Sequence, residues 1–332
     1  MTSKFQILTI LGSPHDGKSN TRALVEDFVK DVAAEELAVD HRVISLGRKK
    51  VLPCKGCWSC TRDKPCPVSK KDDLEEIKAA MIDCDMLILA SPVYTNQVTA
   101  QMKALFDRLF TWCHIFPLLG KYSLSACTTG KDGHGEVGMF LEKMLATYGT
   151  YSFGTINSIF GFTPGFFPGR DRARAKNKRL AARVARTVLE GKKPPINRMQ
   201  RKMFKVMRRK MTGVHAINCM RHGNLDSQPE PPWLRLKIMN HFIEKLGFTD
   251  KQLDTWAGFL EFELGWWRSQ GWLDTKSFSE LAARPVPADF NTKQRLLQSE
   301  HLRPGGGDQE GPAIPPKPDT GTDEGSAGRW LQ

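Results

Sequence analysis

ILTILGSPHDGKSNT, residues 7–21, is the stretch of sequence that decides the expected fold. Its apolar first part, 7–11, has the composition of a buried strand, and Gly12 ends that strand. A loop of small and polar residues follows and closes at Thr21, directly before an amphipathic helical pattern begins. The start of a helix presents unpaired backbone N–H groups and partial positive charge, so this strand–loop–helix unit predicts a phosphate-binding site.

Strand-like and helix-like segments alternate up to residue 189. The expected strands span 5–11, 41–46, 85–90, 122–127 and 152–160. The expected helices span 21–35, 72–81, 98–112, 135–148 and 171–189. Such alternation predicts an α/β fold, a parallel sheet with helices on both faces. Ligands of these sheets bind at the carboxyl ends of the strands, which directs attention to the loops at 12–21, 91–97 and 128–135.

The overall composition is that of a soluble globular protein large enough for one or two domains. Apolar residues make up 40% of the 332 residues, and charged residues make up 26%. No apolar run approaches the roughly 20 residues that cross a bilayer, and the first residues lack the pattern of a signal peptide. We therefore expect a cytoplasmic protein.

Three short motifs lie in the first third of the chain. They are Gly12-Ser13-Pro14 with Ser19-Asn20-Thr21, then Ser91-Pro92-Val93-Tyr94, then Lys103 with Phe106-Asp107-Arg108. Together they resemble the flavodoxin-like NADPH-dependent FMN reductase family over about residues 4–190, and within it the iron–sulfur flavoproteins. The resemblance implies a doubly wound, five-stranded parallel sheet in the order 2-1-3-4-5.

The same resemblance implies which residues hold the cofactor. The phosphate of FMN would lie on the first loop, and its isoalloxazine ring between the second and third loops. Carried over position by position, the FMN contacts fall on Ser13, Ser19, Asn20, Thr21, Pro92, Val93, Tyr94, Thr95, Asn96, Thr129 and Gly130. The family further implies NAD(P)H as co-substrate and a homodimer or tetramer with the flavin near a subunit interface.

Four cysteines crowd into one segment with the spacing C-x2-C-x2-C-x5-C-P. They are Cys54, Cys57, Cys60 and Cys66. Four thiolates this close suit a compact soft-metal group such as a [4Fe–4S] cluster, and the iron–sulfur flavoproteins show the same spacing. Structural zinc sites usually join two separated cysteine pairs across a longer insert, although zinc stays an alternative. A segment without metal is the third interpretation, because related flavin reductases carry similar cysteines with no demonstrated need for a cluster.

Most of the excess positive charge lies in one segment. Residues 165–211 contain 17 Lys or Arg and two acids, whereas the net charge of the whole chain is +13. The methionines of 198–211 form one helical stripe, namely Met199, Met203, Met207 and Met211. A basic amphipathic helix is typical of contact with an anionic membrane surface or a partner groove. The alternative is a helix packed on its own domain with a solvated basic face. Nucleic-acid binding is a further alternative, which we do not favour because no recognisable module accompanies the charge.

These features divide the chain into three parts. Residues 1–192 form the flavodoxin-like FMN-binding domain, with a cysteine-rich insert at 51–70. Residues 193–300 form a basic and aromatic helical extension. Its expected aromatic helices span 233–247 and 249–271. The last part, 301–332, is rich in Pro, Gly and acids, which predicts disorder.

The function that we expect is that of an FMN-dependent oxidoreductase. It would pass electrons from NAD(P)H or a reduced protein to a redox partner or small-molecule acceptor, with the cluster as a further carrier. Hydride transfer to a flavin needs no side-chain nucleophile, so we assign no catalytic side chain. His134, in the third loop, is either a proton donor or a solvated loop residue. The alternative function is an electron carrier without NAD(P)H activity of its own, which docks to a partner or membrane surface through the basic segment.

Overall fold

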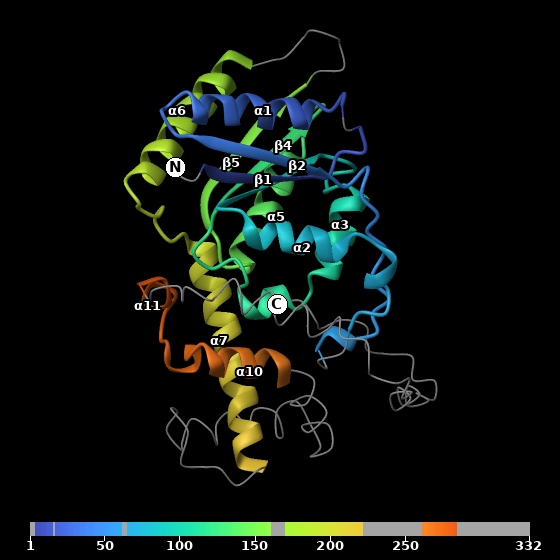
Figure 1. The fold of residues 1–332 in the computed structure, drawn as a ribbon, viewed down its shortest axis with the longest axis vertical. Helices are drawn as coiled ribbons and strands as arrows, with labels where there is room; N and C mark the ends of the chain where they lie inside the picture. The colour runs from blue at the N-terminus through green and yellow to red at the C-terminus, as the bar shows by residue number, and fades with distance from the viewer. Residues whose placement is uncertain (1–3, 16, 62–64, 161–169, 222–260, 284–332) are drawn as a thin grey trace, which may run out of the picture.

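Five parallel strands form one sheet in the order β2-β1-β3-β4-β5 (Figure 1). The strands are β1 Phe5–Leu11, β2 Val39–Ser45, β3 Met86–Pro92, β4 Tyr122–Thr129 and β5 Tyr151–Ile159. The structure, a computed structural model, describes residues 4–15, 17–61, 65–160, 170–221 and 261–283. This strand order confirms the expected flavodoxin-like, doubly wound fold.

Helices cover both faces of the sheet (Figure 1). One face carries α1 (Asn20–Ala33) and α6 (Arg170–Leu189). The other face carries α2 (Leu74–Asp83), α3 (Ala100–Arg108) and α5 (His134–Thr147). The sheet therefore has no solvent-exposed face at its centre, which explains why its central strand, β3, is apolar from Met86 to Ala90.

The sheet separates two apolar cores, because successive side chains of a strand point to opposite faces. Ile7 of β1 belongs to the core with Phe28 of α1 and Val184 of α6. Leu8, the next residue of β1, belongs to the core with Leu141 of α5. Burial of apolar surface on both faces contributes on the order of 25 cal/mol per Å².

The helix expected over 98–112 is interrupted in the structure. Helix α3 ends at Arg108, and a separate short helix, α4 (Trp112–Ile115), follows. The residue after α4 is Phe116, whose φ of 45° lies in the left-handed region. Pro117 follows it, and a proline disfavours helical backbone at the residue before it. The chain therefore leaves the helical path here and turns into β4.

The C-terminal extension packs beside α5 through a third apolar core. Helix α7 (Arg198–Arg221) contacts α5, and α10 (Glu261–Ser269) lies across α7 (Figure 1). The short elements η4 (Trp272–Asp274) and α11 (Phe278–Ala283) also contact α7. This core joins residues of the sheet domain to the extension, among them Phe116, Phe204, Met207, Met211, Val214, Trp267 and Trp272.

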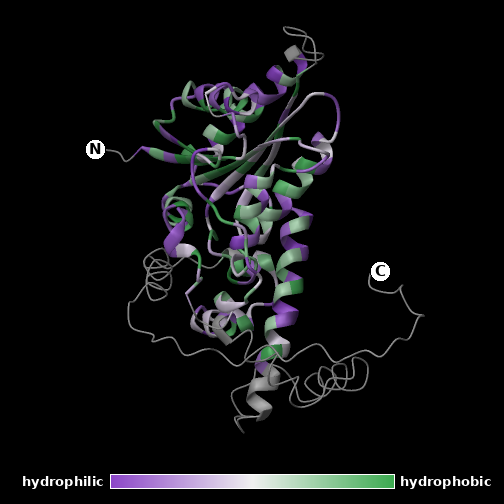
Figure 2. Cartoon of the chain, turned by 90° about the vertical axis from the view of Figure 1, so that its right-hand side faces the viewer, coloured by the Kyte–Doolittle hydropathy of each residue, from purple (hydrophilic) through white to green (hydrophobic). Residues whose placement is uncertain are grey.

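Helix α7 has one buried face and one basic face. Hydrophilic and hydrophobic residues alternate along it in Figure 2. Met207 and Met211 are buried, whereas the exposed face carries Arg201, Lys202, Lys205 and Arg209. The structure confirms the interpretation of α7 as a helix packed on its own chain with a solvated basic face. None of the helices in the described part of the chain has the length and apolar character needed to cross a membrane.

Several expectations fall outside the described residues. They are the helix at 233–247, the first part of the helix at 249–271 and the disordered tail at 301–332. The boundaries of the three parts of the chain also stay a prediction.

Candidate functional site

The three loops singled out from the sequence meet at the carboxyl edge of the sheet. The hydroxyl oxygens of Thr21 and Thr128 lie 2.5 Å apart, which joins the start of α1 to the end of β4. The backbone N–H of Val93 donates to the carbonyl of Thr128 at 2.8 Å. The Thr99 hydroxyl, at the start of α3, donates to the carbonyl of Gly12 at 2.7 Å. These bonds hold the ends of β1, β3 and β4 together.

The first loop has buried hydroxyls at the start of a helix. Ser19 caps α1, and its Oγ accepts a hydrogen bond from the backbone N–H of Arg22. Ser13 is buried, and its Oγ accepts from the backbone N–H of His15. Asn20 begins α1 and is exposed. Such a capped helix start is the site that sequence analysis assigns to a phosphate.

The second loop is a tight turn that presents an exposed aromatic ring. Tyr94 and Gln97 exchange two backbone hydrogen bonds of 2.9 and 3.0 Å. Between them, Thr95 and Asn96 have φ values of 51° and 57°, so both occupy the left-handed region. The side chain of Tyr94 is 44% exposed, although large aromatic residues are usually buried. Pro92 and Val93, before the turn, are half-buried.

The third loop lies directly against the second. Gly133 has a φ of 77°, and a Cβ there would lie 2.8 Å from both Asn96 Oδ1 and Val93 Cγ1. Only glycine fits this position, because it combines a left-handed backbone with close contact. Thr129 is buried and its hydroxyl donates to the carbonyl of Asp132, whereas Gly130 is exposed.

These loops fit the group that the sequence predicts for them. The Nδ1 atom of His134, the first residue of α5, is buried and has no hydrogen-bond partner among the described residues. Such an unpaired polar atom is uncommon in a folded protein and indicates a missing partner. The exposed ring of Tyr94, the buried hydroxyls and the glycine-rich third loop suit a molecule with a phosphate and a flat polar ring. Which of the predicted residues contact FMN stays a prediction.

The four cysteines lie on the connection between β2 and α2. All four are free thiols: Cys54 and Cys57 are exposed, and Cys60 and Cys66 are half-buried. Burial raises the pKa of Cys60 to about 11, with further contributions from Glu263 and from the other three cysteines. The four thiols are therefore close enough to influence one another electrostatically.

The donor set of this loop fits a soft-metal group in its chemistry, since it offers four thiols and no disulfide. Within the described residues, however, no three His, Cys, Asp or Glu side chains already converge as a metal-binding group. The positive φ values of Gly56 and Trp58, 65° and 59°, fold the loop sharply between the first three cysteines.

A buried ion pair closes the base of the cysteine loop, and sequence reasoning missed it. Asp72 and Arg108 pair at 2.5 Å, and their side chains are 0% and 1% exposed. Arg108 also donates to the carbonyl of Leu52, and Asp72 accepts from the backbone N–H of Leu52. The clasp therefore ties both ends of the loop to α3. Arg108 belongs to one of the three short motifs of the sequence. Its partner, Asp72, lies 36 residues away in the chain, so no local pattern connects the two residues.

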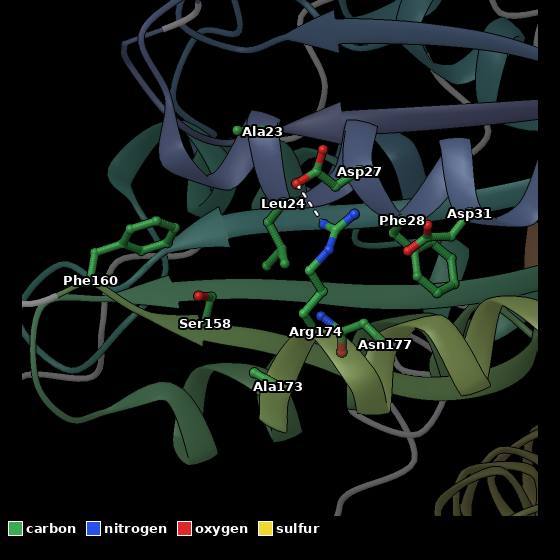
Figure 3. Close-up of a pocket in the computed structure, with 10 residues that line it drawn as sticks. All are labelled: Ala23, Leu24, Asp27, Phe28, Asp31, Ser158, Phe160, Ala173, Arg174 and Asn177. Atoms are coloured by element: carbon green, nitrogen blue, oxygen red, sulfur yellow. Dashed lines mark hydrogen bonds and ion pairs between the residues drawn. The ribbon is translucent and has the colours of Figure 1, made fainter. Parts of the chain in front are cut away.

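A pocket of about 140 Å³ lies elsewhere, between α1, α6 and the end of β5 (Figure 3). Asp27 and Arg174 form an exposed ion pair across it. Its lining residues are Ala23, Leu24, Asp27, Phe28, Asp31, Ser158, Phe160, Ala173, Arg174 and Asn177. None of the predicted FMN or cysteine residues lines it, so we place the chemistry at the three loops instead.

Comparison with known proteins finds a family that matches the first half of the chain. Residues 5–163 match the NADPH-dependent FMN reductase family. An iron–sulfur flavoprotein of Archaeoglobus fulgidus is 31% identical over 177 residues, which cover 53% of this chain and 77% of that protein. The chain belongs to the NADPH-dependent FMN reductase family. Membership supports an FMN-dependent oxidoreductase, and the matched residues include all three loops and the cysteine segment.

Other similar proteins cover less sequence or have more distant structures. An iron–sulfur flavoprotein of Methanocaldococcus jannaschii is 39% identical over 103 residues, covering 31% of this chain and 51% of that protein. A solved NADH:FMN oxidoreductase without ligand is 24% identical, with a TM-score of 0.42 over 55% of this chain and 90% of that one. An NAD(P)H:quinone oxidoreductase from Methanothermobacter marburgensis is 18% identical, with a TM-score of 0.41 over 56% of this chain and 98% of that one.

Proposed function

We propose that this protein is an oxidoreductase that binds FMN at the three loops and passes electrons from NAD(P)H or a reduced protein to an acceptor. The observation that carries the proposal is the convergence of the loops around Gly133, whose place against Val93 and Asn96 leaves no room for a side chain. FMN, when bound, supplies a ring that accepts a hydride or single electrons.

The residues of this chain would bind FMN and orient its ring. The first turn of α1, with Ser19 and Thr21, offers backbone N–H groups and hydroxyls to a phosphate. Backbone N–H groups of the third loop, around Gly130, would stabilise negative charge on the ring edge. Tyr94 covers part of the site with its exposed ring. His134 holds a buried nitrogen free for a hydrogen bond to a bound molecule.

The four cysteines are the proposed ligands of a [4Fe–4S] cluster. Support comes from four free thiols on one loop and from the names of similar proteins as iron–sulfur flavoproteins. The cluster, when bound, supplies a one-electron carrier. The role of the chain is to hold the loop closed at its base, through Asp72 and Arg108.

Flavin and iron quantification on the full-length chain, purified without air, tests both parts of this proposal. We expect close to one FMN per chain and about four iron atoms with four sulfides. A protein that binds no FMN when FMN is supplied would overturn the flavin site. A protein that binds FMN but holds zinc or no metal would overturn the cluster alone.

An electron carrier is the second candidate, favoured by the exposed basic face of α7. Arg201, Lys202, Lys205 and Arg209 lie on that face and suit an acidic redox partner or an anionic membrane surface. Steady-state oxidation of NADPH with a quinone acceptor separates the two functions. Rapid turnover would reject the carrier, whereas slow NADPH oxidation with fast reduction by a reduced ferredoxin would favour it.

We also propose a homodimer or tetramer. Tyr94, in the second loop, and Met139, on α5, are large hydrophobic side chains that are nevertheless exposed, which supports burial against a second copy. Light scattering on the FMN-loaded protein tests the assembly, and a monomer at all concentrations would contradict it.

A further inference from the structure

Three polar side chains from three helices form a hydrogen-bonded row inside the protein. His114 of α4 has its Nδ1 3.1 Å from Glu263 Oε1 of α10. The Nζ of Lys210, from α7, lies 3.3 Å from His114 Nε2. The side chains of His114 and Glu263 are 3% and 0% exposed. A neutral imidazole satisfies both contacts, because the ammonium of Lys210 donates to Nε2 and Nδ1–H donates to the carboxylate.

The second carboxylate oxygen of Glu263 takes no part in this row of hydrogen bonds. Oε2 is buried and has no hydrogen-bond partner among the described residues. Burial of an unpaired polar group is unfavourable, and an apolar side chain of similar size would avoid that penalty. Packing alone therefore does not account for a glutamate at this position.

The neighbour of this carboxylate is the cysteine loop. Helix α10 contacts η1 (Ser59–Thr61), the helical turn that contains Cys60. Aromatic contacts join the cysteine loop to His114, the partner of Glu263, since Trp58 packs edge-on against Phe110 at 5.3 Å and Phe110 packs against His114 at 5.1 Å.

We propose that Glu263 is a positioning residue that places a fixed negative charge beside the cysteine loop, so that the C-terminal extension sets the reduction potential of the group the cysteines bind. This inference rests on the proposed [4Fe–4S] cluster. A buried negative charge makes the addition of an electron less favourable, and charges outside the ligand set are known to tune such centres. Lys210, on the far side of His114, opposes this effect with its positive charge.

Potentiometric titration of the iron–sulfur absorbance and electron paramagnetic resonance signal tests the inference. The full-length chain is reconstituted with iron and sulfide without air and titrated with dithionite. We expect Glu263→Gln, which keeps the shape and removes the charge, to move the midpoint potential upward. We expect Lys210→Gln to move it downward. The matched control is Asp274→Asn, which removes an exposed carboxylate of the same extension and should leave the potential unchanged.

Opposite shifts in the two variants distinguish an electrostatic role from a structural one, because a damaged loop would lose cluster or shift the same way in both. Glu263→Asp, which keeps the carboxylate, should have a midpoint potential closer to that of the unchanged protein than Glu263→Gln has. An unchanged potential in a fully loaded Glu263→Gln protein overturns the inference and leaves the cluster standing. Shifts of the same sign in both variants also overturn it. If Glu263→Gln does not fold, the sign of the Lys210→Gln shift decides. An unaltered protein without iron would overturn the cluster, and this inference with it.

Discussion

Arg108 and Asp72 form an ion pair that is almost completely removed from solvent, with Nη1 2.5 Å from Oδ2. Both residues also bond to the backbone of Leu52, so the pair closes the base of the loop that carries the four cysteines. A pair in this position links the stability of the fold to the shape of a proposed redox site.

Removal of one partner should destabilise the protein strongly. Because Asp72→Asn leaves Arg108 buried without its counter-charge, we expect the free energy of unfolding to fall by about 3–5 kcal/mol. Urea unfolding followed by circular dichroism measures the change, and iron content after reconstitution should fall as well. The control is Asp107→Asn, which removes the exposed ion pair with Lys103 and should change stability by about 1 kcal/mol or less. Equal effects of the two variants would contradict the structural role of the clasp.

The contact between the second and third loops should govern flavin binding. Gly133→Ala adds a methyl group where the backbone is left-handed and Asn96 and Val93 lie 2.8 Å away. Strain of about 1–2 kcal/mol and displacement of the turn should weaken FMN binding roughly tenfold or more. Quenching of flavin fluorescence measures the affinity. Gly135→Ala, where no atom lies within 4 Å of the new methyl, is the control and should bind FMN normally. Normal affinity in Gly133→Ala would place the ring elsewhere.

The methionine stripe of α7 should contribute to stability rather than to membrane contact. Met211 is fully buried in the third apolar core, so Met211→Ala should lower the free energy of unfolding by about 2–5 kcal/mol. Val206, on the same helix, is 47% exposed, and Val206→Ala should stay within about 0.5 kcal/mol. Thermal and urea unfolding of both variants give the comparison. An unchanged free energy of unfolding in Met211→Ala would mean that the extension does not pack as described.

The stability contributed at Glu142 should depend on pH. Burial raises the pKa of Glu142 above its ordinary value of 4.5, although hydrogen bonds from Ser152 and Ser125 favour the charged form. Because the folded protein binds this proton more tightly than the unfolded chain, stability at this site is lost as pH rises from 4.5 through the folded pKa. The free energy of unfolding of Glu142→Gln should therefore rise relative to that of the unchanged protein over that pH range. Above the range, the difference between the two proteins should stay constant.

Urea unfolding between pH 4 and 8 measures this gain. The control is Glu35→Gln, which replaces an exposed carboxylate beyond the end of α1 and should follow the pH profile of the unchanged protein. A stability difference for Glu142→Gln that does not vary with pH would show that the carboxyl group titrates normally.

The sheet and its loops were predictable because their signals are local. Strand β3 reads as a continuous apolar run, and the start of α1 follows from Ser19 before a helical pattern. The break between α3 and α4 was missed, because the apolar pattern of 98–112 continues through it. Pro117, which signals the end of helical backbone, lies beyond that segment. Arg108, the last residue of α3, turns its side chain toward the cysteine loop.

Sequence alone determined the parallel sheet, the three loops at its carboxyl edge and the close spacing of the four cysteines, because periodicity and turn chemistry are properties of neighbouring residues. Only the tertiary structure decided that Asp72 pairs with Arg108 and that Glu263 reaches His114 across 149 residues. Such pairs depend on how separate helices pack against one another, and burial then gives their charges an influence that no local pattern records.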